Sequence, residues 1–282
     1  MLDTRVNNRF NNRATFPTNL HLQTAELTGA YLSAFPIVDT FLVLNSCARG
    51  QAVPESDLDF AVLVHPDAPS AELLDLKQKW QSFTTTNPDI LHYKKSHRFA
   101  YLHLDIIDGR FLPTRWDEGG GPDQFEVEIG NRIAYAAPLS KEGVYFHQLK
   151  NQWLPYYDET LRRRRFAMIK SACEYDIDHI PILIKRGLYF QAFDRLYKAF
   201  QEFLQILFIA HKTYPIAYNK WIKEQVESLL GLPGLYVQLP SIISVNDLES
   251  VEMIEKGTAL WGLMETYCKS QIELFNTNLV DI

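Results

Sequence analysis

The sequence is poor in cysteine, in positive charge and in long hydrophobic runs, and each shortage excludes a class of protein. Its 282 residues contain three scattered cysteines, Cys47, Cys173 and Cys268, with no Cys-x-x-Cys pair. This argues against a disulfide framework or a zinc site and favours a reducing cytoplasm. No run approaches the roughly twenty apolar residues of a membrane span, and residues 1–9 lack the apolar core of a signal peptide. We therefore expect a cytoplasmic protein with no membrane partner.

The charge balance argues against a large nucleic-acid interface. The formal net charge is −6 and the pI is about 5.8, whereas nucleic-acid-binding domains are usually basic. The one basic run, Arg162 to Arg165, is interpreted as a solvated helix face with salt bridges, and an acidic or RNA partner is the alternative. A glycine-rich loop at 117–123 is no phosphate-binding P-loop, because no Gly-Lys-Ser/Thr follows it.

The pattern of apolar residues divides the chain into two halves of different character. In the first half, helices are predicted over residues 19–35 and from Ser70 through 80, and strands over 40–44, 60–64, 99–107, 125–129 and 133–136. In the second half, helices are predicted over 156–175, 181–210 and 246–275, with Pro181 as the first residue of the middle one. The expected fold class is α+β, with a mixed-sheet domain at 1–140 and a helical bundle at 141–282.

The segment between the first two predicted strands carries the candidate chemistry. A small-residue turn with Ser46 and Arg49 follows the first strand, and Asp57 and Asp59 lead into the second. Residues i and i+2 of a strand point to the same side, so the two carboxylates aim at one point. Like charges this close are unfavourable unless a cation lies between them. Hard oxygen ligands indicate Mg²⁺ or Mn²⁺.

This segment also resembles a known family. The motif Ser-x-Ala-Arg-Gly from Ser46, followed by Ser-Asp-Leu-Asp-Phe from Ser56, is similar to the signature of polymerase-β-like nucleotidyltransferases. The closest resemblance is to the minimal branch that adenylylates aminoglycosides and lincosamides. The family has glycine where this chain has Asn45. Asparagine is the residue that best replaces glycine at a positive φ, so we expect the turn to survive, with nucleotide binding weakened or the phosphate shifted.

The resemblance implies a Mg²⁺-dependent transfer of a nucleoside monophosphate, with one or two metal ions and ATP or another nucleoside triphosphate as donor. Asp57, Asp59 and a third carboxylate on a neighbouring strand would hold the metal. Asp105 is the first choice because it interrupts an apolar strand. Asp108, before a glycine, is its competitor and has the position of a turn residue. Asp105 would also take the proton from the attacking hydroxyl, with Glu126 or Glu128 as alternatives.

Cationic and hydroxyl side chains complete the expected site. Ser46 would bind the triphosphate, and Arg49 would contact phosphates or pair with a neighbouring carboxylate. Lys220, after a proline-containing loop, would offer a cation from the helical domain, or is a solvated surface residue. Cys47 is interpreted as a small turn residue rather than a nucleophile. The histidines, His103 among them, lack metal-ligand spacing and are interpreted as structural.

The function is left open between three hypotheses, two of which differ in the acceptor. A small hydroxyl-bearing molecule such as an antibiotic is the first hypothesis. A protein or tRNA acceptor, as in toxin–antitoxin adenylylators, is the second. A non-catalytic nucleotide-binding protein is the third, and a template-directed polymerase is disfavoured by the acidic composition.

Overall fold

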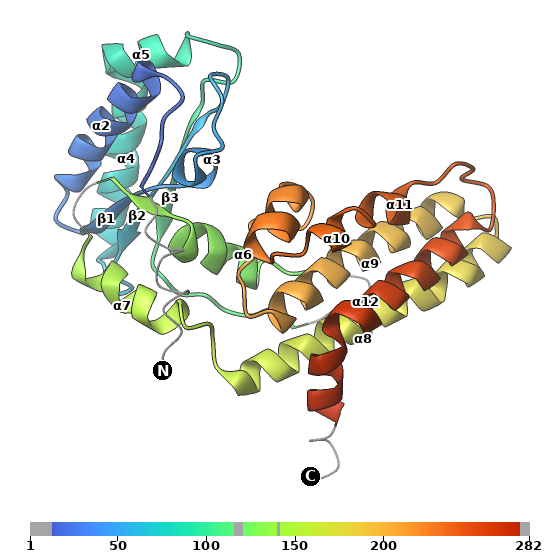
Figure 1. Cartoon of the computed structure of the whole chain (residues 1–282). Coiled ribbons are helices and arrows are strands. Elements are labelled where there is room, and N and C mark those ends of the chain that lie inside the picture. Colours follow the sequence, from blue (N-terminus) through green and yellow to red (C-terminus); the bar gives the residue numbers. More distant parts are fainter. Residues whose placement is uncertain (1–12, 116–120, 140–141, 277–282) are drawn as a thin grey trace. The chain divides into compact units, whose positions relative to one another are not determined.

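The computed structural model describes residues 13–115, 121–139 and 142–276, without side chains for 272–276. These residues form two compact units (Figure 1). The sheet unit contains the described residues of Met1–Leu112 and Glu128–Pro155, and the helical unit contains those of Pro113–Val127 and Tyr156–Ile282. A mixed sheet with helices and a separate helical part confirm the predicted α+β class.

Four strands form the sheet in the order β3-β2-β1-β4. Their bounds are Val38–Val43 for β1, Leu58–Val64 for β2, Leu102–Ile107 for β3 and Ala137–Pro138 for β4. Strand β1 is antiparallel to both β2 and β4, whereas β2 and β3 are parallel. The strands predicted around 40–44, 60–64 and 99–107 are confirmed with shifted ends.

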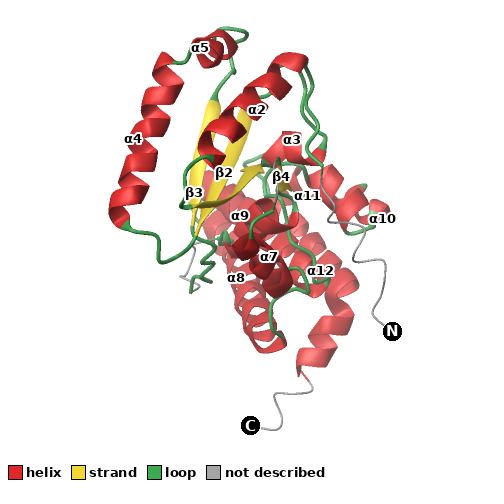
Figure 2. Cartoon of the chain, turned by 90° about the vertical axis from the view of Figure 1, so that its left-hand side faces the viewer, coloured by secondary structure: helices red, strands yellow, loops and turns green. Residues whose placement is uncertain are grey.

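One face of the sheet packs into the core of the sheet unit. The opposite face carries the aspartates of the candidate site and is called the acidic face. Alternate residues of β2, Leu58, Phe60 and Val62, pack with Ala25 and Leu32 of a helix, α2. Helix α2 (Asn19–Ser33) is the predicted first helix, capped by the Thr18 hydroxyl, and Figure 2 shows it lying across the strands. Because side chains of a strand alternate between faces, Asp57 and Asp59 are directed away from this core.

Further helices complete the sheet unit. They are α3 (Asn45–Arg49), α4 (Ser70–Thr86), α5 (Pro88–Lys94), α7 (Val144–Trp153) and the π-helical turn η1 (Gly130–Ala134). The boundary predicted at residue 140 differs from the observed division, which keeps α7 in the sheet unit. The start of α7 is attached to β1 through Asp39, whose carboxylate accepts the backbone N–H groups of Tyr145 and Phe146 at 3.0 Å.

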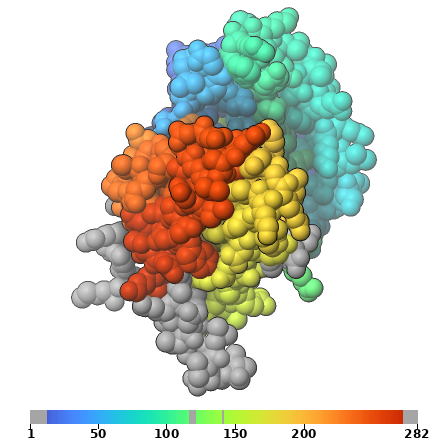
Figure 3. Space-filling view, turned by 90° about the vertical axis from the view of Figure 1, so that its right-hand side faces the viewer, coloured from blue at the N-terminus to red at the C-terminus, as the bar shows by residue number. Residues whose placement is uncertain are grey.

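The helical unit contains three long helices and several short ones. The long ones are α8 (Glu159–Lys185), α9 (Tyr189–Ala210) and α12 (Glu252–Asn276), and the short ones are η2 (Glu224–Leu229), α10 (Pro233–Tyr236) and α11 (Leu239–Ile243). Figure 3 shows α12, in red, beside the yellow segment in which α8 ends and α9 begins. Met253 of α12 packs there with Ile180 of α8 and Leu196 of α9. Among the described residues, no helix has the length and apolar character needed to span a membrane.

Three sequence predictions about secondary structure are wrong. Residues 125–129 form a helix, α6 (Phe125–Ile129), instead of a strand, since the Asp123 carboxylate accepts the N–H of Phe125 at its start. Residues 133–136 lie partly in η1 and precede β4. Pro181 lies inside α8 and starts no helix. The break comes at Gly187, whose φ of +70° favours glycine and ends the helix.

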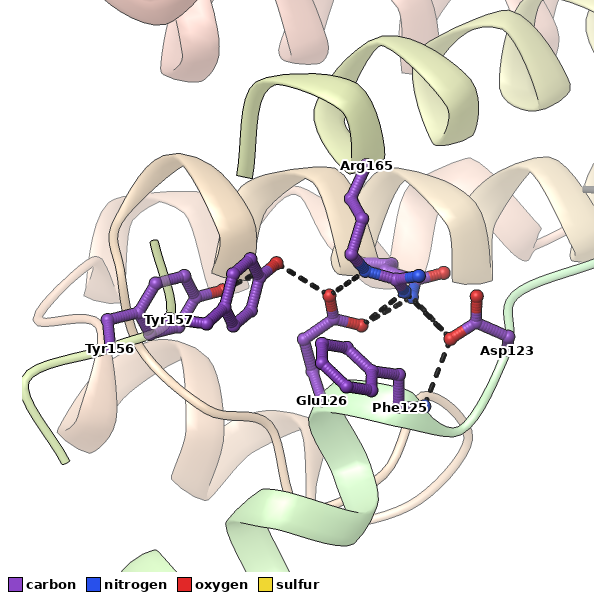
Figure 4. A network of polar contacts seen from close by, with 7 residues as sticks. Asp123, Phe125, Glu126, Tyr156, Tyr157 and Arg165 are labelled. Atoms are coloured by element: carbon purple, nitrogen blue, oxygen red, sulfur yellow. Dashed lines mark hydrogen bonds and ion pairs between the residues drawn. The ribbon is translucent and has the colours of Figure 1, made fainter. Parts of the chain in front are cut away.

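The arginine run is also different from its prediction, because two of its members are buried. Arg162 and Arg165 are 1% and 2% exposed. Arg165 lies among the carboxylates of Asp123 and Glu126, with Nη2 at 2.7 Å and 2.8 Å from them (Figure 4). Burial lowers the pKa of Arg165, but the hydrogen bond and charge of Glu126 outweigh burial and raise it above its usual range. Two of the four arginines are therefore buried in the helical unit, and Arg165 belongs to an ion-pair network there, so the run is not the solvated face that its sequence predicts.

Candidate functional site

The candidate site is built by the parallel pairing of β2 with β3. In this register Leu58 lies beside Leu102, Asp59 beside His103 and Ala61 beside Asp105. Residues that face each other across neighbouring strands point to the same side of the sheet. The acidic face therefore receives side chains from both strands at one level.

Three side chains meet on this face. One ligand atom from each of Asp57, Asp59 and His103 lies within 4.8 Å of the other two. The His103 Nε2 atom is 3.5 Å from Oδ2 of Asp57. Among the described residues, this is the group of at least three acidic, histidine or cysteine side chains close enough to hold one metal ion. Two carboxylates and an imidazole fit a divalent cation.

His103 is the residue that sequence reasoning missed. Its sequence context predicts a structural role, because the histidines lack metal-ligand spacing. The available signal was its place at the middle of a predicted strand, two residues before Asp105 and on the same side. The register that sets it beside Asp59 is a tertiary feature.

Asp105, the predicted third carboxylate, shares the acidic face but lies one step further along β3. Its Oδ2 atom is 3.6 Å from Nη2 of Arg132, and it is not a member of the three-residue group. Its role as a metal ligand or base stays a prediction. Asp108 has the turn role expected of it, because its carboxylate accepts the N–H of Arg110 at 3.0 Å, next to Gly109 with a φ of +71°.

The predicted base alternatives lie in different environments. Glu128 pairs with Arg132, with Oε2 at 3.7 Å from Nη1. Glu126 is fully buried in the helical unit and accepts the Tyr157 hydroxyl at 2.7 Å in addition to Arg165. Burial and the charge of Glu126 in turn raise the pKa of Tyr157 far above its usual range. Glu126 thus has a structural role in this network.

Ser46 and Arg49 lie in α3, the single turn and a half of helix between β1 and β2. The Ser46 carbonyl accepts the N–H of Gln51 at 2.9 Å, and Gly50 closes the helix with a φ of +72°. Cys47 and Ala48 of α3 belong to the same buried cluster as Leu58, which keeps α3 close to the start of β2. Phosphate contacts by Ser46 and Arg49 stay predictions.

Asn45 takes the left-handed conformation that the sequence predicts for it. Its φ is +53°. Its Nδ2 atom also donates a hydrogen bond to Oδ2 of Asp59 at 2.8 Å. Asn45 therefore keeps the turn and adds a contact to a candidate metal ligand.

Cys47 is unsuited to nucleophilic chemistry. The side chain is buried, and burial, with the charges of Asp59 and Asp57, raises the pKa of its thiol to about 12. The nucleophile is the thiolate, which is scarce at neutral pH with such a pKa. Its structural interpretation is therefore supported.

Lys220 belongs to the helical unit, where it is exposed and precedes η2. The Gln225 side chain donates to the Lys220 carbonyl at 2.9 Å and to that of Ala217 at 2.8 Å, which orders this turn. The acidic group lies in the sheet unit, so a contribution of Lys220 to the site stays a prediction.

Comparison with known proteins finds a distant structural likeness and no sequence match. No family model and no curated protein matches the sequence. Among solved structures, a nucleotidyltransferase-like protein from Exiguobacterium sibiricum 255-15 is similar, with a TM-score of 0.44 and 14% identity over 93% of this chain and 78% of the other. At this identity and TM-score the likeness assigns no activity, so the function is inferred from the site itself.

Proposed function

We propose that the protein is a metal-dependent nucleotidyltransferase that moves a nucleoside monophosphate from a nucleoside triphosphate to a hydroxyl group. The observation that carries the proposal is the grouping of Asp57, Asp59 and His103 on one face of the sheet. The Ser46 turn and the Asp-x-Asp strand, with the spacing that resembles the family signature, support it.

The chemistry explains why such a group is needed. A hydroxyl attacks the α-phosphorus in line while pyrophosphate leaves, and negative charge develops on both oxygens. Divalent metal ions stabilise the attacking and the leaving oxygen in such displacements. Asp57 and Asp59 would hold the metal, with His103 as the third ligand. Asp105 is the alternative third ligand, and it would have to leave Arg132 for this role.

The ligand set also bears on the identity of the metal. Carboxylates suit Mg²⁺ and Mn²⁺, whereas imidazole is a more frequent ligand of softer transition metals. A set with two carboxylates and one imidazole suits Mn²⁺ at least as well as Mg²⁺. Both ions therefore belong in the test of activity.

For the acceptor we propose a small hydroxyl-bearing molecule, with an antibiotic of the aminoglycoside or lincosamide type as the first class to test. A protein or tRNA acceptor is the alternative. ATP is the first donor to test, because an adenine preference is what the resemblance implies.

The test uses the full chain with Mg²⁺ or Mn²⁺ and each of the four α-labelled nucleoside triphosphates. Antibiotics and cell extract supply the acceptors, and a double variant, Asp57→Asn with Asp59→Asn, is the control. Label that moves to a small molecule or a macromolecule, and stops in the double variant, supports the proposal and names the acceptor class. Metal-dependent nucleotide binding without transfer to any acceptor would instead indicate a non-catalytic nucleotide-binding protein.

A further inference from the structure

Arg132 lies at the edge of the acidic face, in a π-helical turn. Its side chain is 29% exposed, and its guanidinium lies between two carboxylates, with Nη2 at 3.6 Å from Asp105 and Nη1 at 3.7 Å from Glu128. It belongs to η1, and π-helical turns are often found at functional sites. All three residues belong to the sheet unit.

Asp105 links Arg132 to the strand that carries His103 of the metal-ligand group. Asp105 follows His103 by two residues on β3, so their side chains share a face and start about 7 Å apart. The chain then runs from η1 to β4, which pairs with β1. In the sheet order β3-β2-β1-β4, β4 is the edge strand opposite to β3. Arg132 therefore begins a segment that passes from the β3 side of the sheet to its β1 side.

The ion pairs of Arg132 are loose ones. Charge-assisted hydrogen bonds of a guanidinium measure about 2.7–2.9 Å, and both of its ion-pair distances are well beyond this. Arg165 shows the contrast, with Nη2 at 2.8 Å from Glu126 and almost no exposure. Arg132 is thus held at the edge of the acidic face by charge, and its donors are not committed to short hydrogen bonds with these two carboxylates.

We infer that Arg132 binds the phosphates of the metal-bound nucleoside triphosphate that leave as pyrophosphate. The inference rests on the proposed function, since the metal at Asp57, Asp59 and His103 brings the triphosphate to this face. Arginine suits this role because its planar fork donates two hydrogen bonds to phosphate oxygens. Asp105 and Glu128 position the guanidinium before the nucleotide arrives.

The experiment compares Arg132→Gln with Arg110→Gln in the full chain. Arg110 is a matched control, because it is a sheet-unit arginine with two equally loose carboxylate partners, Asp67 at 3.9 Å and Asp108 at 4.0 Å. Titration calorimetry measures the binding of Mn²⁺ alone, and then of ATP, AMP and tripolyphosphate in the presence of Mn²⁺.

Arg132→Gln is expected to lower the affinity for ATP and for tripolyphosphate by about tenfold or more, as for the loss of a hydrogen bond between charged groups. Its affinity for AMP and for Mn²⁺ alone should change by less than about twofold. The affinity of Arg110→Gln for every one of these ligands should also change by less than about twofold. Arg132→Lys, which keeps the charge, should recover part of the loss and serves as the second variant if Arg132→Gln does not fold.

The outcomes separate this inference from the proposed function. Equal ATP affinity in Arg132→Gln and the unaltered protein would overturn the role of Arg132 and leave the proposed function standing. An equal loss of affinity for Mn²⁺ alone would show a structural role and overturn it as well. If the unaltered, folded protein binds neither Mn²⁺ nor ATP with Mn²⁺, the proposed function fails and the role of Arg132 fails with it.

Discussion

The side-chain amide of Asn45 donates a hydrogen bond to Oδ2 of Asp59 at 2.8 Å, across the gap between the end of β1 and the start of β2. Asn45 has a positive φ, and the N–H of its neighbour Leu44 donates to the Asp59 carbonyl at 2.9 Å. Both the backbone and the side chain of Asp59 are thus fixed from one turn. Hydrogen bonds to a ligating carboxylate orient it toward the metal.

The first prediction concerns this hydrogen bond. Asn45→Gly keeps the backbone free to adopt its positive φ and removes only the amide, so Asp59 loses its orientation while the turn remains. We expect a loss of roughly tenfold or more in Mn²⁺ affinity, as is typical for residues that support a metal ligand. Calorimetry of Mn²⁺ binding measures it, and urea unfolding checks that the fold persists. Unchanged affinity in a folded variant would show that the amide has no part in the metal site.

The second prediction decides between two third ligands. Because His103 meets Asp57 and Asp59 whereas Asp105 meets Arg132, His103→Ala should weaken Mn²⁺ binding by about tenfold or more. Asp105→Asn should change Mn²⁺ binding alone far less. Electron paramagnetic resonance of free Mn²⁺ quantifies both. A larger loss in Asp105→Asn would restore Asp105 as the ligand that the sequence predicts.

The third prediction concerns the arginine run. Arg165→Met leaves the carboxylate of Glu126 buried without its cation, and we expect a loss of about 3–5 kcal/mol in the free energy of unfolding. Arg164→Met, at an exposed position one residue earlier, should change it by less than about 0.5 kcal/mol. Urea denaturation measures both variants. Equal effects would mean that the run is the solvated face that its sequence suggests.

The fourth prediction is a pH dependence caused by Glu202 of α9. Burial, reinforced by the charge of Asp176, raises the pKa of this carboxyl to about 9. Arg195 and Lys198 act in the opposite direction without outweighing burial. The folded state therefore keeps a proton that the unfolded chain releases above its ordinary pKa of 4.5. The contribution of Glu202 to the free energy of unfolding is therefore fully present below pH 4.5 and is lost as the pH rises toward 9.

Glu202→Gln should remove this loss, because the amide does not ionise. The slope of unfolding free energy against pH between 5 and 9 should become shallower by roughly one kcal/mol per pH unit, and the variant should exceed the unaltered protein in stability at pH 8. Urea unfolding at several pH values measures the two slopes. Parallel profiles would show that Glu202 is ionised in the folded protein.

Local patterns account for the predictions that succeeded. The strand around Phe60 and the pairing of Asp57 with Asp59 follow from a two-residue period that a short segment contains by itself. The conformation of Asn45 follows from its own steric preference. The strand predicted over residues 125–129 is wrong because it also rests on a local pattern, an alternation of apolar and acidic residues that is typical of a strand. The pattern does not show that Arg165 gives Glu126 a buried partner.

By itself the sequence determined the α+β class, the place of the acidic turn and the presence of two aspartates on one face, since each depends on neighbouring residues. Only the tertiary structure decided that His103 joins those aspartates and that Arg132 lies beside Asp105. Parallel strands are joined through long connections, so their register is set by packing and not by a local turn. The burial of Arg165 was decided in the same way, because a buried charge is stable only beside a partner that the fold brings to it.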